Sequence, residues 1–265
     1  MQKSRLEAGI ARRLSGLAIA VVACCHCGDS SETTPNPADA GGVKDATPDV
    51  APVDAGAETG GKPAAPTSLR ALESNAEGIS DACKVADYAK AQGVLGEANT
   101  NWNTIKPLVG TAGASAALIA KIDAQLAKMA ADITGKLQRD CESDANAATL
   151  TIPDLFDLYT FAVPSDALRG DGVFRQLQID SEYKDFAAAA PDLASTKTVW
   201  ARLRPLAVVQ AGKRTDVPGT ATVVADMDTA IQKCEVAITA MDPAGLGTEA
   251  QNGLDYIDTV ETMFK

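Results

Sequence analysis

The chain has 265 residues, with 24 lysines and arginines against 35 aspartates and glutamates, and its formal net charge is -11 at pH 7. This acidic balance argues against nucleic acid and against an anionic lipid surface as partners, because both carry the same sign of charge. The chain is long enough for one domain with a large hydrophobic core.

The N-terminus has the layout of a secretory signal. It carries four basic residues, Lys3, Arg5, Arg12 and Arg13. The apolar run that follows, Leu14 to Ala23, is too short for a membrane-spanning helix, which needs about 20 apolar residues. We therefore predict a signal peptide over residues 1–23.

The four residues Val21-Val22-Ala23-Cys24 decide which kind of signal this is. They resemble the lipobox of bacterial lipoproteins, which implies that Cys24 is lipidated and becomes the new N-terminus. Three acyl chains would hold the protein on a membrane. Because Cys25 stands where an aspartate would retain a lipoprotein in the inner membrane, the resemblance implies the outer membrane, on its periplasmic or surface face. An ordinary secretory signal cleaved nearby is the alternative.

Cys25, His26 and Cys27 follow at once and raise the question of a metal site. Thiolates and imidazole suit zinc or copper. However, lipidation removes the Cys24 thiol, no fourth ligand is near, and adjacent ligands on a flexible strand make a poor cage. We expect no metal here, and the role of these three residues stays open.

Residues 24–66 are expected to be a disordered tether behind the lipid. From residue 28 to 66 the segment holds seven acidic and two basic residues among Ala, Pro, Gly, Asp and Thr. Such a composition does not bury enough apolar surface to offset the entropy of ordering the chain. The folded domain should therefore occupy residues 67–265.

Two segments of that domain match each other. NWNTIKPL at 101–108 returns as VWARLRPL at 199–206, and further matches continue after a seven-residue insertion, including Asp123 with Asp228. We predict two diverged tandem repeats, 79–159 and 177–264.

The apolar residues of each repeat recur every three or four positions, which is the helical period. The first helix of each repeat should run through Tyr88 to Val109 and through Phe186 to Ala207. The second should contain Ile119 to Ile133 and Val224 to Ile238. The expected fold is all-α, an antiparallel bundle of helical hairpins, with four long helices and one shorter helix closing each repeat.

Helix ends follow from local signals. Pro107 and Pro205 should stop or kink the first helix of each repeat, because proline disfavours helical geometry in the residue before it. Thr248 with Gln251 has the spacing of a capping box that would open a last helix ending at Phe264.

Three cysteines lie within the domain. If the first hairpin turns near Ala112, Cys83 and Cys141 lie equally far from the turn and reach the same level, in a compartment where disulfides persist. Cys83 lies at the edge of the apolar face of its helix and not on that face, so the sequence leaves open whether the two cysteines are bonded. Cys234 continues an apolar stripe and should be an inert core thiol.

The repeated Trp-x-x-apolar-basic-Pro motif is the most distinctive element, and it has two interpretations. In one, Trp102 and Trp200 are core residues while Lys106 and Arg204 neutralise carbonyls at a helix end. In the other, these four residues flank a cleft between the repeats that receives an anionic or aromatic ligand.

Catalytic chemistry has few candidates. With His26 outside the domain, no Ser-His-Asp, Cys-His or zinc-hydrolase arrangement can form within 67–265. Carboxylates spaced along helices could bind a hard cation, but such spacing is typical of a solvated face. They are Asp154 and Asp157, and Asp255, Asp258 and Glu261. We predict no catalytic residue, no metal and no cofactor.

The sequence therefore favours a non-enzymatic bacterial lipoprotein, a helical binding or scaffolding module of the cell envelope. Its partners would be the membrane, through the lipid anchor, and an envelope protein or a small ligand. The alternative is a carboxylate-based metal carrier or a weak metal-dependent enzyme. The partner's identity, the oligomeric state and the membrane face are not determined by the sequence.

Overall fold

The computed structural model describes residues 61–265, so Cys24, the predicted signal peptide and most of the predicted tether lie outside the described residues. Within this range the chain forms helices and no strand, which confirms the all-α prediction. The helices are α1 (Thr67–Lys84), α2 (Tyr88–Thr111), α3 (Ala116–Gly135), α4 (Gln138–Thr151), α5 (Pro153–Phe156), α6 (Ser165–Tyr183), α7 (Phe186–Ala211), α8 (Val223–Ala240) and α9 (Pro243–Phe264).

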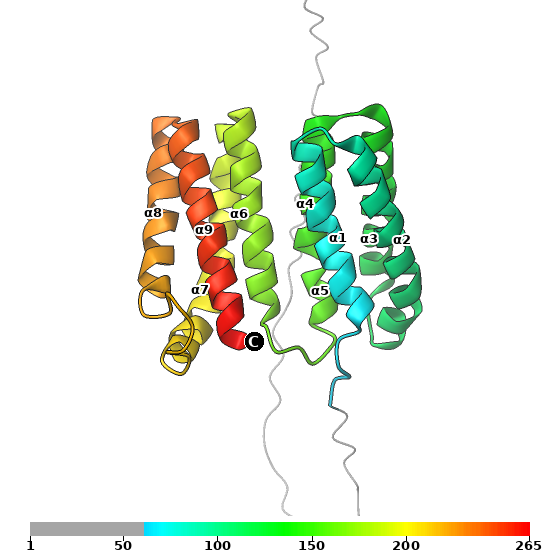
Figure 1. The fold of residues 1–265 in the computed structure, drawn as a ribbon, viewed down its shortest axis with the longest axis horizontal. Coiled ribbons are helices and arrows are strands. Elements are labelled where there is room, and N and C mark those ends of the chain that lie inside the picture. The colour runs from blue at the N-terminus through cyan, green and yellow to red at the C-terminus, as the bar shows by residue number, and fades with distance from the viewer. Residues whose placement is uncertain (1–60) are drawn as a thin grey trace, which may run out of the picture. The chain divides into compact units, whose positions relative to one another are not determined.

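The helices form two groups, which we call the first half (α1–α5, four long helices and the short α5) and the second half (α6–α9, four long helices) (Figure 1). Consecutive long helices run antiparallel, and most are joined by short turns, whereas residues 212–222 join α7 to α8 and the short α5 with a loop joins α4 to α6. In the first half α1 packs against both α2 and α4, and in the second half α6 packs against both α7 and α9. The halves meet where α4 packs against α6, so α4 and α6 form the junction.

The number of long helices was predicted wrongly. The helices α1 and α6 were missed, α4 was not separated from α3, and α9, with 22 residues, is as long as its neighbours. The apolar stripe of α1 is fully buried at Leu69, Leu72 and Ile79. Twelve of the 18 residues of this helix lie before the start of the predicted first repeat at residue 79, so the comparison of repeats did not reveal it.

Equivalent positions in the two halves have the same local geometry. Asp87 and Asp185 cap α2 and α7, where their side chains accept hydrogen bonds from the backbone N–H groups of Lys90 and Ala188. Lys136 and Met241, which end α3 and α8, both have left-handed backbone angles. These pairs fall at the offsets of the sequence matches and support the duplication, which remains an inference from the sequence.

The prolines do not stop the first helix of each repeat, so this part of the prediction, which allowed a stop or a kink, is wrong. Helix α2 continues past Pro107 to Thr111, and α7 continues past Pro205 to Ala211. A proline removes one backbone hydrogen bond of its helix. Val109 and Ala207, two residues beyond each proline, are fully buried, and this burial offsets the missing bond.

The predicted capping box at Thr248 is also wrong. Helix α9 begins at Pro243, and the Asp242 side chain caps it by accepting a hydrogen bond of 3.0 Å from the Gly245 N–H. Thr248 lies inside the helix and donates to the Ala244 carbonyl at 2.9 Å. Aspartate before a proline at the first helical position is the stronger start signal.

The predicted apolar stripes form the core. Leu95, Trp102, Ile105 and Val109 of α2 are buried, as are Leu193, Trp200, Leu203 and Ala207 of α7. Glycines allow two close helix contacts: Gly253 of α9 lies against the ring of Phe174 of α6, and Gly172 of α6 lies against Leu150 of α4. A side chain at either glycine would collide with its neighbour.

Candidate functional site

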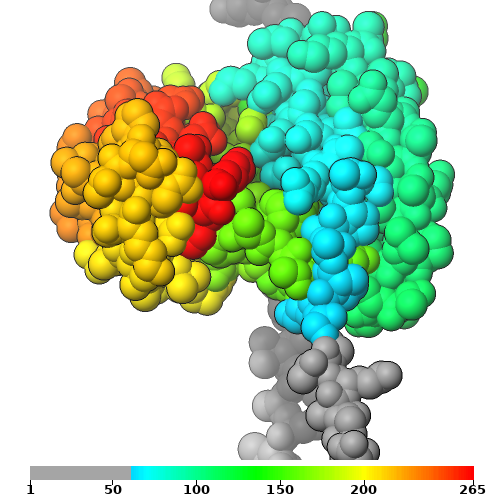
Figure 2. Space-filling model, turned by 60° about the horizontal axis from the view of Figure 1, so that its bottom comes forward, coloured from blue at the N-terminus to red at the C-terminus, as the bar shows by residue number. Residues whose placement is uncertain are grey.

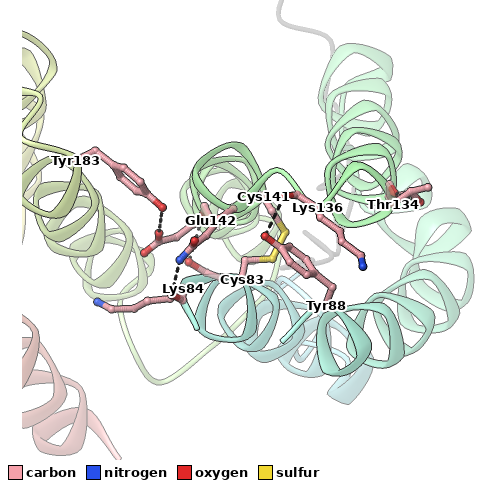
Figure 3. Close-up of a disulfide and its surroundings, with 11 residues drawn as sticks. Cys83, Lys84, Tyr88, Thr134, Lys136, Cys141, Glu142 and Tyr183 are labelled. Atoms are coloured by element: carbon pink, nitrogen blue, oxygen red, sulfur yellow. Dashed lines mark hydrogen bonds between the residues drawn. A yellow bond between two sulfur atoms is a disulfide. The ribbon is translucent and has the colours of Figure 1, made fainter. Parts of the chain in front are cut away.

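Cys83 and Cys141 form a disulfide that joins the end of α1 to the start of α4, with 5.9 Å between the Cα atoms (Figure 3). The predicted reason for the pairing was wrong, because neither cysteine lies on the α2–α3 hairpin. They meet because α1 and α4 are antiparallel neighbours. Both cysteines are fully buried, and Cys234 is a buried free thiol whose pKa burial raises to about 12.

A buried carboxyl group lies beside the disulfide (Figure 3). The backbone carbonyl of Glu142 accepts a hydrogen bond of 3.3 Å from the Ser80 hydroxyl, and its side chain accepts one of 3.4 Å from the Tyr183 hydroxyl. Burial, and then the charge of Glu182, raise the pKa of Glu142 to about 7. This cluster connects α1, α4 and α6, so it links the two halves.

The two predicted tryptophan motifs each have a shared aspartate that the sequence analysis did not assign. Trp102 donates its indole N–H to Asp123 at 2.7 Å, and the Lys106 ammonium pairs with the same carboxylate at 2.7 Å. Trp200 donates to Asp228 at 2.7 Å, and the Arg204 guanidinium pairs with Asp228 at 2.8 Å. The matched aspartates of the two repeats were the signal that could have predicted this contact.

These two Trp–Asp–cation clusters correct both interpretations in part. Trp102 and Trp200 are core residues with 2% and 6% exposure, as the first interpretation states. However, the cations pair with carboxylates and not with helix-end carbonyls. The predicted cleft between the repeats is wrong, because each cluster lies within its own half, between α2 and α3 or between α7 and α8. The reason is that each tryptophan faces the second helix of its own hairpin.

The aspartates and the cations of the two clusters keep each other charged. Hydrogen bonds from Lys106 and Trp102 lower the pKa of Asp123, and hydrogen bonds from Arg204 lower that of Asp228. The same pairing raises the pKa of Arg204. A general acid or base works best with a pKa near the working pH, so these groups are unsuited to proton transfer.

Asp228→Asn should lower the free energy of unfolding by about 1–2 kcal/mol, because it removes the charge that accepts from Trp200 and Arg204. Asp123→Asn in the first half should cost about the same. The measurement is urea denaturation of each variant. Asp226→Asn, also on α8, is the control and should cost about 0.5 kcal/mol through the helix dipole. Equal losses for Asp226→Asn and Asp228→Asn would contradict the assignment.

Two adjoining grooves follow α7 and α8, with volumes of about 310 Å³ and 300 Å³. Both are lined by Lys197, so we treat them as one surface, the α7–α8 groove. Its floor is apolar and includes Leu193, Trp200, Ile231 and Ile238. Its edges carry ion pairs between the two helices: Lys197 with Glu235 at 2.9 Å, and Arg204 with Asp228. The first half has a groove of about 540 Å³ between α2 and α3, beside Tyr88 and Lys136.

A second polar region lies where α1 approaches α6 and α9, and we call it the acidic seam. Its carboxyl groups are Glu73, Glu77, Asp81, Asp171, Asp258 and Glu261, and its cations are Arg175 and Lys265. The predicted carboxylates Asp258 and Glu261 belong to this seam, whereas Asp255 accepts a hydrogen bond from Gln251 on its own helix. In the part of the chain that the structure describes, no three acidic, cysteine or histidine side chains converge as metal ligands.

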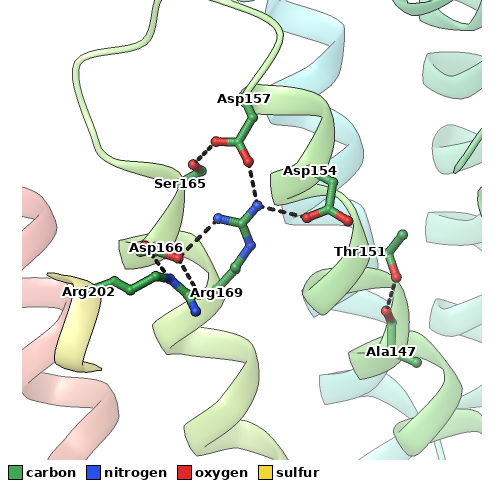
Figure 4. A network of polar contacts seen from close by, with 8 residues as sticks. All are labelled: Ala147, Thr151, Asp154, Asp157, Ser165, Asp166, Arg169 and Arg202. Atoms are coloured by element: carbon green, nitrogen blue, oxygen red, sulfur yellow. Dashed lines mark hydrogen bonds and ion pairs between the residues drawn. The ribbon is translucent and has the colours of Figure 1, made fainter. Parts of the chain in front are cut away.

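The other predicted carboxylates have a structural role (Figure 4). Asp154 and Asp157 both pair with Arg169 of α6, at 2.7 and 2.6 Å. Arg169 also pairs with Asp166, which accepts from Arg202 of α7 at 2.7 Å. The network therefore connects α5 to α6 and α7, and these carboxylates are occupied by guanidinium groups.

The chain matches no protein-family model, no curated protein and no solved structure. None of the helices within residues 61–265 combines the length and the hydrophobicity needed to cross a membrane.

Proposed function

We propose that the chain is a lipid-anchored protein of the bacterial outer membrane, and that its helical domain is a non-enzymatic binding module. The anchor would be Cys24, on the strength of the lipobox resemblance. The observation that carries the binding role is the α7–α8 groove. Its two adjoining pockets have an apolar floor, and charged side chains lie along both edges. Burying apolar surface on a partner is the main favourable term in protein association.

The dimensions of the groove fit a helical segment of another envelope protein. It follows α7 from Ala190 to Arg204, which corresponds to about 21 Å of helix. A groove of this length accommodates several anchoring side chains of an amphipathic helix.

The charges along the groove give it a direction. Lys197 and Arg204 lie on the α7 edge, and Asp228 and Glu235 lie on the α8 edge. A partner helix with acidic residues on one side and basic residues on the other would match these edges by exchanging with the ion pairs that already join α7 to α8. Such complementarity selects the partner and its orientation more than it raises affinity.

Site-specific photocrosslinking in intact cells tests the proposal. A crosslinking amino acid at Ala194, which is exposed and lines the groove, should give a discrete adduct with an envelope protein. The matched control is Ser195, the next residue, which is exposed and lies outside the groove lining. Ala194→Arg should abolish the adduct when the crosslinker is placed at Ala201, also in the lining. No adduct, or the same adducts from Ala194 and Ser195, would contradict the proposal.

The alternative of a metal carrier or weak metal-dependent enzyme is tested by measuring metal per chain in protein extracted from membranes. A stoichiometric metal that is lost in the Asp255→Asn/Asp258→Asn variant would favour that alternative over the binding module.

A further inference from the structure

The groove of the first half lies at the position that corresponds to the α7–α8 groove of the second half. We call it the α2–α3 groove, and its volume is about 540 Å³. Gln92 of α2 lines it, and Ala190, at the matching position of the predicted second repeat, lines the α7–α8 groove. On the opposite wall each groove has an isoleucine followed by a threonine at matching positions, which are Ile133 and Thr134 of α3 and Ile238 and Thr239 of α8. The two grooves are therefore formed by the same part of the hairpin in each half.

The two hairpins also carry charges in the same order. Further along the helices that form the α2–α3 groove, Lys106 of α2 pairs with Asp123 of α3 at 2.7 Å. At the matching positions Arg204 of α7 pairs with Asp228 of α8 at 2.8 Å. In both hairpins the basic side chain lies on the first helix and the acidic side chain on the second. A partner helix whose charges complement one groove therefore complements the other in the same orientation.

One charge pair distinguishes the two grooves. Lys197 pairs with Glu235 at 2.9 Å in the α7–α8 groove, whereas the matching residues of the predicted first repeat are Asn99 and Ala130. The α2–α3 groove keeps an apolar lining, which includes Tyr88 and Ile133. We expect it to bind the same helix with a smaller electrostatic contribution, because one of the two charge contacts is missing.

The two hairpins lie on opposite sides of the junction between the halves. Helices α2 and α3 pack against α1 and α4, whereas α7 and α8 pack against α6 and α9. Figure 1 shows α2 and α8 at the two outer edges of the helical domain, with α4 and α6 between them. In the space-filling view of Figure 2 the first half and the second half likewise occupy opposite sides. A partner helix bound in one groove therefore leaves the other groove open.

The start of the described chain lies between the halves and not at either groove. The Pro63 carbonyl accepts a hydrogen bond of 2.7 Å from the Thr160 N–H, and the Ala65 N–H donates to the Thr160 carbonyl at 3.2 Å. Thr160 lies in the loop between α5 and α6, which joins the two halves. None of residues 61–66 lines either groove, so this segment leaves both of them accessible.

We propose that the helical domain is a bivalent bridge, which binds two copies of one envelope protein, one copy in each groove. Each copy contributes an amphipathic helix with acidic residues along one side and basic residues along the other. This inference rests on the proposed function, because it assigns the ligand of the α7–α8 groove to the α2–α3 groove as well. Two sites on opposite sides join two partner molecules, and engaging both sites in an assembly raises the avidity above the affinity of either site.

Photocrosslinking of the full-length chain in intact cells tests the bridge. A crosslinking amino acid at Gln92 and one at Ala190, both exposed, should give adducts of the same mass. Mass spectrometry should map both adducts to the same helical segment of the same protein. A chain that carries both crosslinkers should give a product that contains two partner copies. The control position is Lys90, which is exposed and lies outside the groove lining, and it should give no such adduct.

Two matched variants block one groove at a time. Thr134 and Thr239 are exposed residues at matching positions in the two linings, and an arginine at either position would fill its groove. Thr134→Arg should remove the Gln92 adduct and leave the Ala190 adduct. Thr239→Arg should do the reverse. The adduct that remains in each variant shows that the chain is folded.

The outcomes separate the bridge from the proposed function on which it rests. An adduct from Ala190 alone would overturn the bridge and leave the binding role of the α7–α8 groove in place, whereas no adduct from either position would overturn both. The bridge is also overturned if the two positions capture different proteins, if the doubly crosslinked product contains a single partner copy, or if one blocking variant removes both adducts.

Discussion

Removing the Cys83–Cys141 disulfide should lower the free energy of unfolding by about 4 kcal/mol. The two cysteines are 58 residues apart, so the bond shortens a long loop of the unfolded chain that contains all of α2 and α3. The test is the double variant Cys83→Ala/Cys141→Ala, compared with the oxidised parent by urea denaturation.

The control for this prediction is Cys234→Ala. Cys234 is equally buried but unpaired, so its replacement removes a core thiol without opening a crosslink. A core truncation of this size should cost about 1–2 kcal/mol. If Cys234→Ala were as damaging as the double variant, the crosslink would not be the source of the stability. The reduced parent should unfold close to the double variant.

Gly253→Ala should destabilise the second half by about 3 kcal/mol. The added methyl group would overlap the ring of Phe174, which is 1% exposed and fixed between α6 and α9. Because the ring has no free space to enter, α9 would have to move away from α6. Thermal unfolding should show the loss, since each kcal/mol lowers the melting temperature of a domain of this size by about 2–4 °C.

Gly96→Ala is the matched control for this change. Gly96 is exposed within α2, and nothing lies within 4 Å of the added carbon. Alanine should stabilise the helix there by about 0.5–1 kcal/mol. A second check is Gly253→Ala combined with Phe174→Leu, which should lose less than the sum of the two single changes because the smaller side chain relieves the overlap. Strict additivity would argue against the Gly253–Phe174 contact.

The disulfide and Gly253→Ala predictions both measure how firmly the helices within one half are joined. This rigidity matters for the proposed binding module. A binding groove on α7 and α8 needs a rigid second half, which the Phe174–Gly253 contact supports. The disulfide fastens α1 to α4 and so makes the first half rigid as well.

The sequence by itself determined the helical class and the hairpin helices. The apolar stripes of α2, α3, α7 and α8 repeat every three or four residues, and such a pattern buries one face only in a helix. The burial of Trp102 and Trp200 was one of the two interpretations that the sequence left open for the tryptophan motif. The pairing of Cys83 with Cys141 could be suggested but was justified by the wrong helices.

Tertiary structure alone decided the rest. Pro107 and Pro205 are tolerated because the residues beyond them are buried by other helices, which a local rule does not include. Asp123 and Asp228 acquire their role only when the second helix of each hairpin lies against the first. In the acidic seam, burial and then the charge of Glu261, nearly 190 residues along the chain, raise the pKa of Glu73 to about 7. Hydrophobic periodicity is a property of one helix, whereas charge pairing and pKa shifts depend on which helices become neighbours.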